Sequence, residues 1–236
     1  ARRAVALTGA GISVPSGIPD FRSPGTGLWA DVNPMEVAHI GAFRRDPVRF
    51  WSFYGTRFAT LDGKRPNRAH AALAELERRG LIQAVITQNI DGLHRAAGTR
   101  DLIEVHGSVA TSSCLACDAP PVGLETTRER LAGAPDGVPR CRGCGAPLKP
   151  DVVLFGELLP EAAIERAAAL AASADVLLCV GSSLEVHPVA GLPELTLGAG
   201  GAVALVTAGP TPYDGAAAVK LGGDVVAELD AVLAAL

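Results

Sequence analysis

Residues 4–13 read AVALTGAGIS, a short apolar run followed by a glycine-rich turn. A run without polar alternation is typical of a strand that is buried on both faces of a sheet. Similar runs rich in valine, isoleucine and leucine occur at residues 81–87, 102–106, 175–181 and 202–207. Helices are expected at residues 70–79, 160–174 and 224–236. The alternation predicts an α/β fold, in which a Rossmann-like parallel sheet carries helices on both faces.

Two segments interrupt this alternation. Residues 31–69 hold most of the aromatic side chains, and residues 111–150 hold two Cys-x-x-Cys pairs with many prolines and glycines. We expect the first segment to be a helical insertion and the second a zinc-ribbon insertion, which together form a small domain. The Rossmann-like domain is then expected to comprise residues 1–30, 70–110 and 151–236.

Composition and charge limit the classes of protein to which the chain can belong. The chain has 236 residues, a net charge of −4 and 48% hydrophobic residues. This mild acidity argues against a nucleic-acid binder, which usually needs a concentrated basic face, but it permits a basic peptide substrate. We find neither a membrane span nor a secretory signal. Paired cysteines favour a reducing compartment, so we expect a cytoplasmic protein. We also expect a monomer, with Cys179 buried in a strand.

The turn after the first strand is a candidate phosphate site. Gly9 and Gly11 let the backbone approach a phosphate, and a following helix would supply free N–H groups. Taken alone, these glycines indicate only a tight turn. The dinucleotide fingerprint is incomplete, because Val14 replaces the third small residue and Asp31 does not end a clear second strand. A loop with Asp20, Phe21 and Arg22 follows, and it could close over a bound cofactor.

Polar residues follow two of the predicted strands. Gln88, Asn89 and Asp91 come after one strand, where ligands bind in open α/β sheets, although Asn and Asp are also common helix caps. His106 follows the next strand, and a neutral imidazole there could act as a general base. A structural histidine is the alternative.

The four paired cysteines predict a metal site. Cys114, Cys117, Cys141 and Cys144 supply four thiolates for tetrahedral zinc, and no coordination position is left open, so the zinc is expected to be structural. Redox chemistry is the alternative, but one pair would suffice for it.

Taken together, these segments resemble the sirtuins, which are NAD-dependent protein deacylases. The matching pieces run in the family's order and cover nearly the whole chain: residues 9–13, 17–22, 87–91, 106–107, the cysteine pairs, 153–157 and 181–184. The resemblance implies that NAD lies across the carboxyl end of the sheet. The implied cofactor contacts are Gly9, Ala10, Gly11, Ile12, Ser13, Asp20, Phe21, Arg22, Gln88, Asn89, Ile90, Asp91, Gly181, Ser182, Ser183, Thr207, Asp224 and Val225.

The resemblance also implies a mechanism. The acyl oxygen of an acyl-lysine protein or peptide attacks the anomeric carbon as nicotinamide leaves, with Asn89 and Asp91 nearest the chemistry. His106 then acts as the general base on a ribose hydroxyl, and the products are free lysine, nicotinamide and O-acyl-ADP-ribose. The peptide is expected to add as a strand between two segments. Their implied contact residues are Val153, Phe155, Gly156 and Glu157 on one side and Leu184 and Val186 on the other.

Two features bear on the acyl group and the cofactor. Sirtuins that prefer acidic acyl groups carry a Tyr-x-x-Arg pair with a small Ala upstream, and Ala38, Tyr54 and Arg57 match that spacing. Arg57 could bind a succinyl or malonyl carboxylate, whereas the alternative is that Tyr54 packs on the zinc lobe and Arg57 is solvated. We place deacetylation first and desuccinylation second. Thr207 stands where the family usually has Asn, which predicts a weaker hold on the ribose.

Three other classes of protein remain as alternatives. A mono-ADP-ribosyltransferase would share the cofactor site but label protein without needing an acyl group. A dehydrogenase would reduce NAD, which the incomplete fingerprint disfavours. A catalytically silent zinc module would release no nicotinamide, and the presence of Asn89, Asp91 and His106 argues against it.

Overall fold

The computed structural model describes residues 3–20, 27 and 32–236. Its larger sheet has six parallel strands in the order β3-β2-β1-β7-β8-β9. The strands are β1 (Ala4–Thr8), β2 (Val85–Thr87), β3 (Leu102–Glu104), β7 (Val176–Val180), β8 (Ala202–Val206) and β9 (Val219–Leu221). The predicted α/β fold with a parallel sheet is confirmed. The sequence did not predict the short edge strand β9. Strand β2 begins later than expected because residues 81–84 connect the preceding helix to it, and Leu81 and Ile82 bond back to Leu76.

Strand alternation divides the core of this sheet into two halves. In β1, Val5 and Leu7 lie in one cluster of buried residues, while Ala6 lies in the other. The neighbouring strand β7 repeats the pattern, with Leu177 and Cys179 on the first side. Because side chains alternate along a strand, one apolar run supplies both faces.

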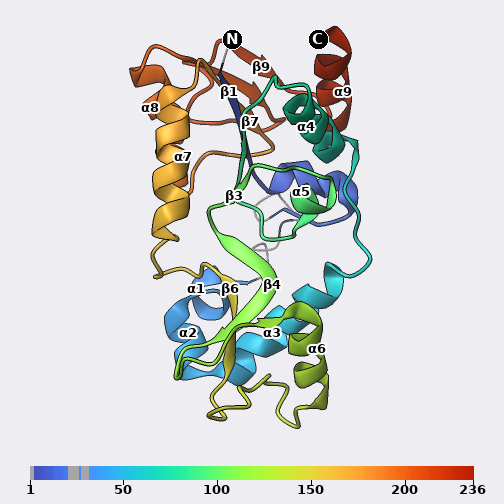
Figure 1. Ribbon diagram of the computed structural model, residues 1–236, viewed down its shortest axis with the longest axis vertical. Coiled ribbons are helices and arrows are strands. Elements are labelled where there is room, and N and C mark those ends of the chain that lie inside the picture. The colour runs from blue at the N-terminus through green and yellow to red at the C-terminus, as the bar shows by residue number, and fades with distance from the viewer. Residues whose placement is uncertain (1–2, 21–26, 28–31) are drawn as a thin grey trace.

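Helices cover both faces, as predicted (Figure 1). One side carries α7 (Glu161–Ser173) and α8 (Leu192–Gly198), and the other carries α4 (Arg68–Arg78) and α9 (Val225–Ala235). Helix α4 begins after a capping box formed by Asn67 and His70. The remaining helices on this sheet are the 3-10 helices η1 (Ala10–Ser16) and η2 (Val189–Gly191) and the short α5 (Leu93–Ala96).

The smaller sheet is antiparallel, with the order β5-β4-β6. Its strands are β4 (Gly107–Cys114), β5 (Val122–Gly123) and β6 (Leu148–Val152), and they extend slightly beyond the predicted insertion at 111–150. Helices α1 (Pro34–Val37), α2 (Ile40–Arg45) and α3 (Pro47–Thr60) pack on this sheet through aromatic side chains. Trp51 is fully buried and donates its indole N–H to the Leu148 carbonyl at 2.9 Å.

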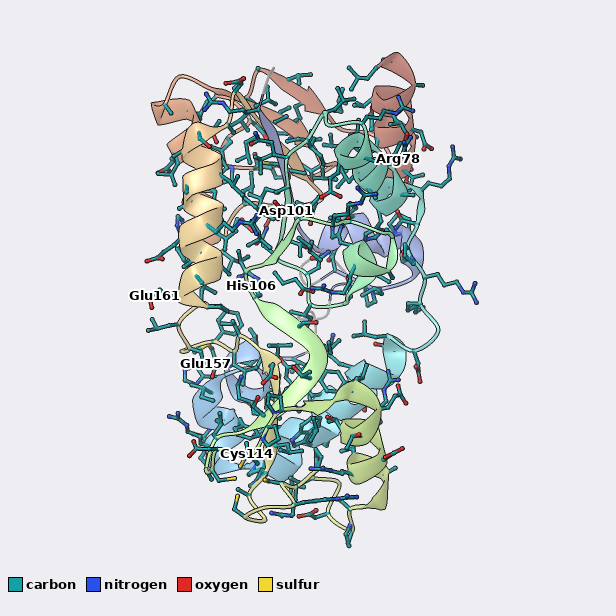
Figure 2. All side chains as sticks on the ribbon, in the orientation of Figure 1. Arg78, Asp101, His106, Cys114, Glu157 and Glu161 are labelled. Carbon is teal, nitrogen blue, oxygen red and sulfur yellow. The ribbon has the colours of Figure 1, made fainter. Side chains whose placement is uncertain are left out.

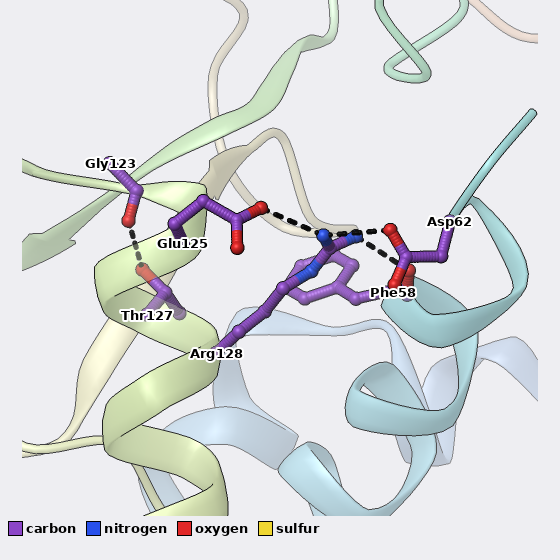
Figure 3. A network of polar contacts seen from close by, with 6 residues as sticks. All are labelled: Phe58, Asp62, Gly123, Glu125, Thr127 and Arg128. Carbon is purple, nitrogen blue, oxygen red and sulfur yellow. Dashed lines mark hydrogen bonds and ion pairs between the residues drawn. The ribbon is translucent and has the colours of Figure 1, made fainter.

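Helix α6 (Leu124–Gly133) is tied to α3 by one arginine (Figure 3). The guanidinium of Arg128 donates to Asp62 and Glu125, each at 2.9 Å, and to the Phe58 carbonyl at 3.1 Å. Since Phe58 belongs to the aromatic cluster, this network fixes α6 beside the core of the smaller sheet.

None of the helices within the described residues has the length and apolar character that a membrane crossing requires.

Candidate functional site

A cavity of about 710 Å³ is lined by segments that follow strands of the larger sheet and by residues of the smaller sheet and α3. His106 lies at the lower end of the larger sheet, and Glu157 lies below it toward the smaller sheet (Figure 2). Many of the predicted site residues meet in this cavity. They are Ala10, Ser13, Ala38, Tyr54, Arg57, Gln88, Asn89, Ile90, Asp91, His106, Val153, Phe155, Gly156, Glu157 and Val186.

Ser13, Asn89 and Asp91 form one hydrogen-bonded group in the cavity wall. The Ser13 hydroxyl donates to Asp91 Oδ2 at 2.7 Å and accepts from Asn89 Nδ2 at 3.2 Å. Asn89 Nδ2 also donates to the Gly9 carbonyl, and Asp91 Oδ1 accepts the N–H of Leu93, the first residue of α5. Asp91 therefore does two things at once, because it holds the start of a helix and faces the cavity.

The His106 ring is held in a single neutral form by its hydrogen bond. Its Nδ1 lies 3.0 Å from the Gln88 carbonyl. Since a carbonyl oxygen can only accept, Nδ1 carries the proton and Nε2 keeps its lone pair. Burial lowers the pKa of His106, and the hydrogen bond to Gln88 offsets part of that shift. The imidazole is therefore neutral near pH 7, which is the form that can accept a proton.

The glycines of the turn serve close packing in this structure. A Cβ on Gly9 would lie 2.8 Å from Ser182 Cβ, and a Cβ on Gly11 would lie 2.8 Å from Gly181 Cα. The Gly11 N–H donates to the Gly181 carbonyl at 2.8 Å. The turn continues into a 3-10 helix with Ile12 buried, and it packs on the end of β7. The expected approach of a phosphate to these glycines stays a prediction.

The remaining predicted cofactor residues lie outside the cavity lining. Gly181, Ser182 and Ser183 follow β7, and Gln88 Nε2 joins that segment to β2 by donating to Ser182 Oγ at 2.9 Å. Thr207 follows β8, and its N–H donates to the Leu221 carbonyl at 3.0 Å. Asp224 caps α9 by accepting the N–H groups of Val226 and Ala227, which places Val225 first in that helix. These segments share the carboxyl edge of the larger sheet.

The predicted cofactor loop is only partly described. Ile18 and Pro19 line the cavity, whereas Asp20 does not. Phe21 and Arg22 lie outside the described residues, so their predicted roles stay predictions.

Both predicted peptide-binding segments contribute to the cavity lining. Residues 153–157 all line it, and so does Val186. The side chain of Leu184 is buried in the core of the larger sheet, and Leu184 is not among the residues that line the cavity. Leu184 has a φ of +55°, a left-handed conformation that is uncommon for a residue other than glycine.

Ala38, Tyr54 and Arg57 all line the cavity. Tyr54 is buried, and burial raises the pKa of its hydroxyl, with Arg57 opposing and Glu157 adding to the shift. Arg57 lies over the Phe53 ring at 4.4 Å, and burial lowers its pKa. The expectation that these residues face the acyl end of a substrate is compatible with this placement. Tyr54 also packs in the aromatic cluster of the smaller sheet, which agrees with the alternative that Tyr54 packs on the zinc lobe.

The four paired cysteines form a compact group of sulfur atoms. All four lie within 4.8 Å of one another, and neighbouring sulfurs are 3.5 to 3.6 Å apart. Backbone N–H groups of Cys144 and Gly143 lower the pKa of Cys141 to about 7, which favours a thiolate ligand. Four thiolates at this spacing fit tetrahedral zinc and leave no open position, which is the arrangement of a structural site.

Comparison with known proteins identifies the family. The sequence model of the Sir2 family matches residues 9–188. The chain belongs to the Sir2 family. One relative, the NAD-dependent protein deacetylase of Caldivirga maquilingensis, is 47% identical over 98% of this chain and 88% of its own length. The NAD-dependent protein deacylase of Thermococcus sibiricus is also 47% identical, over 84% of this chain and 78% of its own length.

Solved Sir2 structures share the fold of this Sir2 chain. A complex of Sir2 with a p53 peptide and NAD⁺ has a TM-score of 0.91 and 40% identity, covering 99% of this chain and 93% of that one. A Sir2 protein bound to a propionylated peptide has a TM-score of 0.89, with the same identity and coverage. The resemblance to sirtuins drawn from the sequence is confirmed.

The sequence did not single out two groups that support the site of this Sir2 protein. His70 and His94 are buried behind Ser13 and Thr8, with His94 Nε2 at 2.9 Å from Thr8 Oγ1 and His70 Nε2 at 3.4 Å from Ser13 Oγ. The other group is Lys149, a buried charge on β6. A signal existed for both, since Asn67-x-x-His70 has the spacing of a capping box and Lys149 stands among strand residues.

Proposed function

We propose that this chain is an NAD-dependent protein lysine deacylase that acts on acyl-lysine proteins or peptides. The observation that carries the proposal is His106, which lines the cavity with Nδ1–H bonded to Gln88 and Nε2 left as a base. The Sir2 relatives named above are deacetylases and deacylases, so ADP-ribosyl transfer to protein is not favoured.

NAD⁺ supplies the electrophilic ribose carbon and the hydroxyl that takes up the acyl group. His106 accepts a proton through Nε2 from a hydroxyl placed in the cavity. Asn89 and Asp91 orient ligands at the reacting end, because Ser13 fixes both side chains. Apolar residues such as Ile90 and Val109 line the same space and exclude water from the reaction.

An extended substrate strand fits between residues 153–157 and the segment around Val186. In this binding mode the backbone supplies the hydrogen bonds, so varied flanking side chains are tolerated. Structures of Sir2 proteins with acetylated and propionylated peptides support the same class of substrate for this chain.

We place acetyl first as the acyl group and acidic acyl groups second. Arg57 and Tyr54 line the cavity beside the small Ala38, and an arginine can bind a carboxylate bidentately. Zinc held by the four cysteines would serve structure only. We also propose that the chain has the two domains expected from the sequence and is a monomer in a reducing cytoplasm.

The test measures acetyl and succinyl removal from matched lysine peptides, with nicotinamide release followed in parallel. We expect equal amounts of nicotinamide and deacylated peptide. Arg57→Met should lower succinyl removal about tenfold or more while acetyl removal stays within twofold, because only succinyl needs the guanidinium. Arg49→Met, on the exposed side of the same helix, is the matched control and should change neither rate.

Two results would contradict the proposal in different ways. Nicotinamide release with labelling of protein, and without deacylation, would replace it with ADP-ribosyl transfer. A succinyl rate untouched by Arg57→Met would remove the acidic-acyl role and leave deacetylation standing.

A further inference from the structure

Lys149 is a buried ammonium that the proposed chemistry does not use. It lies on β6, and its Nζ donates to the Pro150 carbonyl at 3.1 Å and to the Val152 carbonyl at 2.9 Å. The same Nζ is 3.0 Å from Glu157 Oε2. These acceptors match the three N–H groups of an ammonium, so Lys149 is fully satisfied in place.

Glu157, the acidic partner of this ion pair, closes a turn. Its Oε2 accepts the N–H of Leu154 at 2.9 Å, and its own N–H donates to the Leu154 carbonyl at 3.0 Å. Gly156 within the turn has a φ of +82°, and a Cβ there would lie 2.6 Å from His39 Nε2. The turn at residues 154–157 is therefore held by its main chain, by the Glu157 carboxylate and by tight packing.

The segment held in this way is one wall of the cavity. The Val153 N–H donates to the His106 carbonyl at 2.8 Å, and the Phe155 N–H donates to the Ala38 carbonyl at 2.9 Å. One end of the segment is thus bonded to the backbone of the proposed base, and the other end is held by the ion pair with Lys149.

The side chains of this ion pair are only 9% and 23% exposed, so the pair is costly when stability alone is considered. Removing two charges from water costs several kcal/mol per ion, and apolar residues of similar volume are often as stabilising. A salt bridge does, however, fix one geometry through its hydrogen bonds. A peptide that adds as a strand gains affinity only if the receiving backbone already has the right geometry.

We infer that Lys149 and Glu157 are positioning residues for the acyl-peptide, because they fix the turn at residues 154–157 against which the peptide adds. The inference rests on the proposed deacylase function. It assigns the pair a role in peptide binding and none in cofactor binding, since neither side chain contacts the group formed by Ser13, Asn89 and Asp91 in the hydrogen bonds described above.

The test compares steady-state constants for Lys149→Met with those of the wild-type chain. Methionine keeps the apolar stem but removes the ammonium, so Glu157 loses its counter-charge. We expect the KM for an acetyl-lysine peptide to rise about tenfold, while the KM for NAD⁺ and the kcat at saturating peptide stay within twofold. A purely structural role would instead lower the thermal midpoint and leave the peptide KM of the folded enzyme unchanged.

Lys220→Met is the matched control. Lys220 also binds a carboxylate and a carbonyl, at 2.6 Å to Asp214 and 2.9 Å to Gly209, but it lies on the edge strand β9. Its removal should leave the peptide KM within twofold.

Glu157→Gln covers the case in which Lys149→Met fails to fold. The amide keeps the shape and can still accept from Leu154, but it lacks the charge that Lys149 binds. We expect a similar rise in the peptide KM. The peptide KM of the double variant should be no higher than that of the single variant with the higher KM. A wild-type peptide KM in folded Glu157→Gln would overturn the inference, as would an equal rise in the KM for NAD⁺.

Direct binding of a fluorescent acetyl-lysine peptide separates this inference from the proposed function. If the wild-type chain binds the peptide but does not turn it over, the deacylase proposal fails and weaker binding by Lys149→Met still supports the positioning role. If the wild-type chain does not bind the peptide, the positioning role fails with it.

Discussion

The two sheets of this molecule are stabilised in different ways. The six-stranded sheet is buried on both faces, and residues such as Leu177 and Leu205 are inaccessible to solvent. The three-stranded sheet has one aromatic core against α3, but its cysteine end is open, with Leu115 and Cys144 exposed. A domain can fold on apolar burial where enough surface is covered, whereas a small ribbon needs a metal. The catalytic cavity lies where these two kinds of stability meet.

The largest expected effect is on the zinc site of the smaller sheet. Cys141→Ala removes one thiolate, and zinc binding to comparable structural sites contributes about 10–16 kcal/mol at pH 7. We expect loss of zinc, measured by atomic spectrometry, together with loss of solubility or of cooperative melting. Cys179→Ala is the matched control, because that cysteine is buried in β7 and should keep the zinc. A stable, active, zinc-free Cys141→Ala protein would contradict the structural role.

A second change tests the boundary between the sheets, where His106 lies. His106→Ala removes the proposed base, so kcat should fall about 10²- to 10⁴-fold. The zinc content, melting temperature and peptide affinity should stay at wild-type values. Since burial lowers the pKa of His106, the acid limb of the wild-type pH profile for kcat/KM should lie below the ordinary histidine value of 6.5. A retained rate would remove His106 from the base role.

The third prediction tests the apolar sheet. Leu177→Ala leaves a cavity in a fully buried position, so the free energy of unfolding should fall by about 2–5 kcal/mol, as measured by urea titration. Zinc should remain bound at temperatures below the new transition. Release of zinc in step with the lost stability would show that the two sheets do not differ as described.

The last prediction is a pH dependence of stability, carried by two buried histidines of the larger domain. Burial lowers the pKa of His70 to about 4 and that of His94 to about 3, with His70 adding to the shift of His94. Below pH 6.5 these two histidines therefore bind protons in the unfolded chain but not in the folded chain. Stability should be complete above pH 6.5 and fall as the pH drops toward 4, by about 3 kcal/mol for His70. Urea midpoints measured from pH 7 to 4.5 on wild type and His70→Gln should show a flatter dependence in the variant.

Sequence reasoning predicted the parts of the fold that rest on long apolar patterns. The ends of strands β1, β7 and β8 and of helices α4, α7 and α9 lie within two residues of the predicted ends. It missed β9, because three residues at an exposed sheet edge carry no buried pattern. It placed β2 four residues too early, because Leu81 and Ile82 are apolar but bond back to Leu76.

The site could be predicted where its residues lie close together in the sequence. It could not be predicted where a residue depends on a partner that is distant in the sequence. Four cysteines in two pairs have one evident purpose, and they lie together. In contrast, the neutral form of His106 depends on a carbonyl 18 residues away, which no pattern reveals. The packing of Gly9 and Gly11 could not be predicted for the same reason, because their partner at Gly181 is distant in the sequence.

Gly107 limits how far this chain can vary. It has a φ of +72°, pairs with Val152, and would place a Cβ only 2.1 Å from the Asp151 carbonyl. Any side chain there must separate β4 from β6 immediately beside His106. In a saturation library this position should accept glycine alone, whereas exposed neighbours such as Ala110 should accept most residues, so the boundary between the sheets tolerates little variation here.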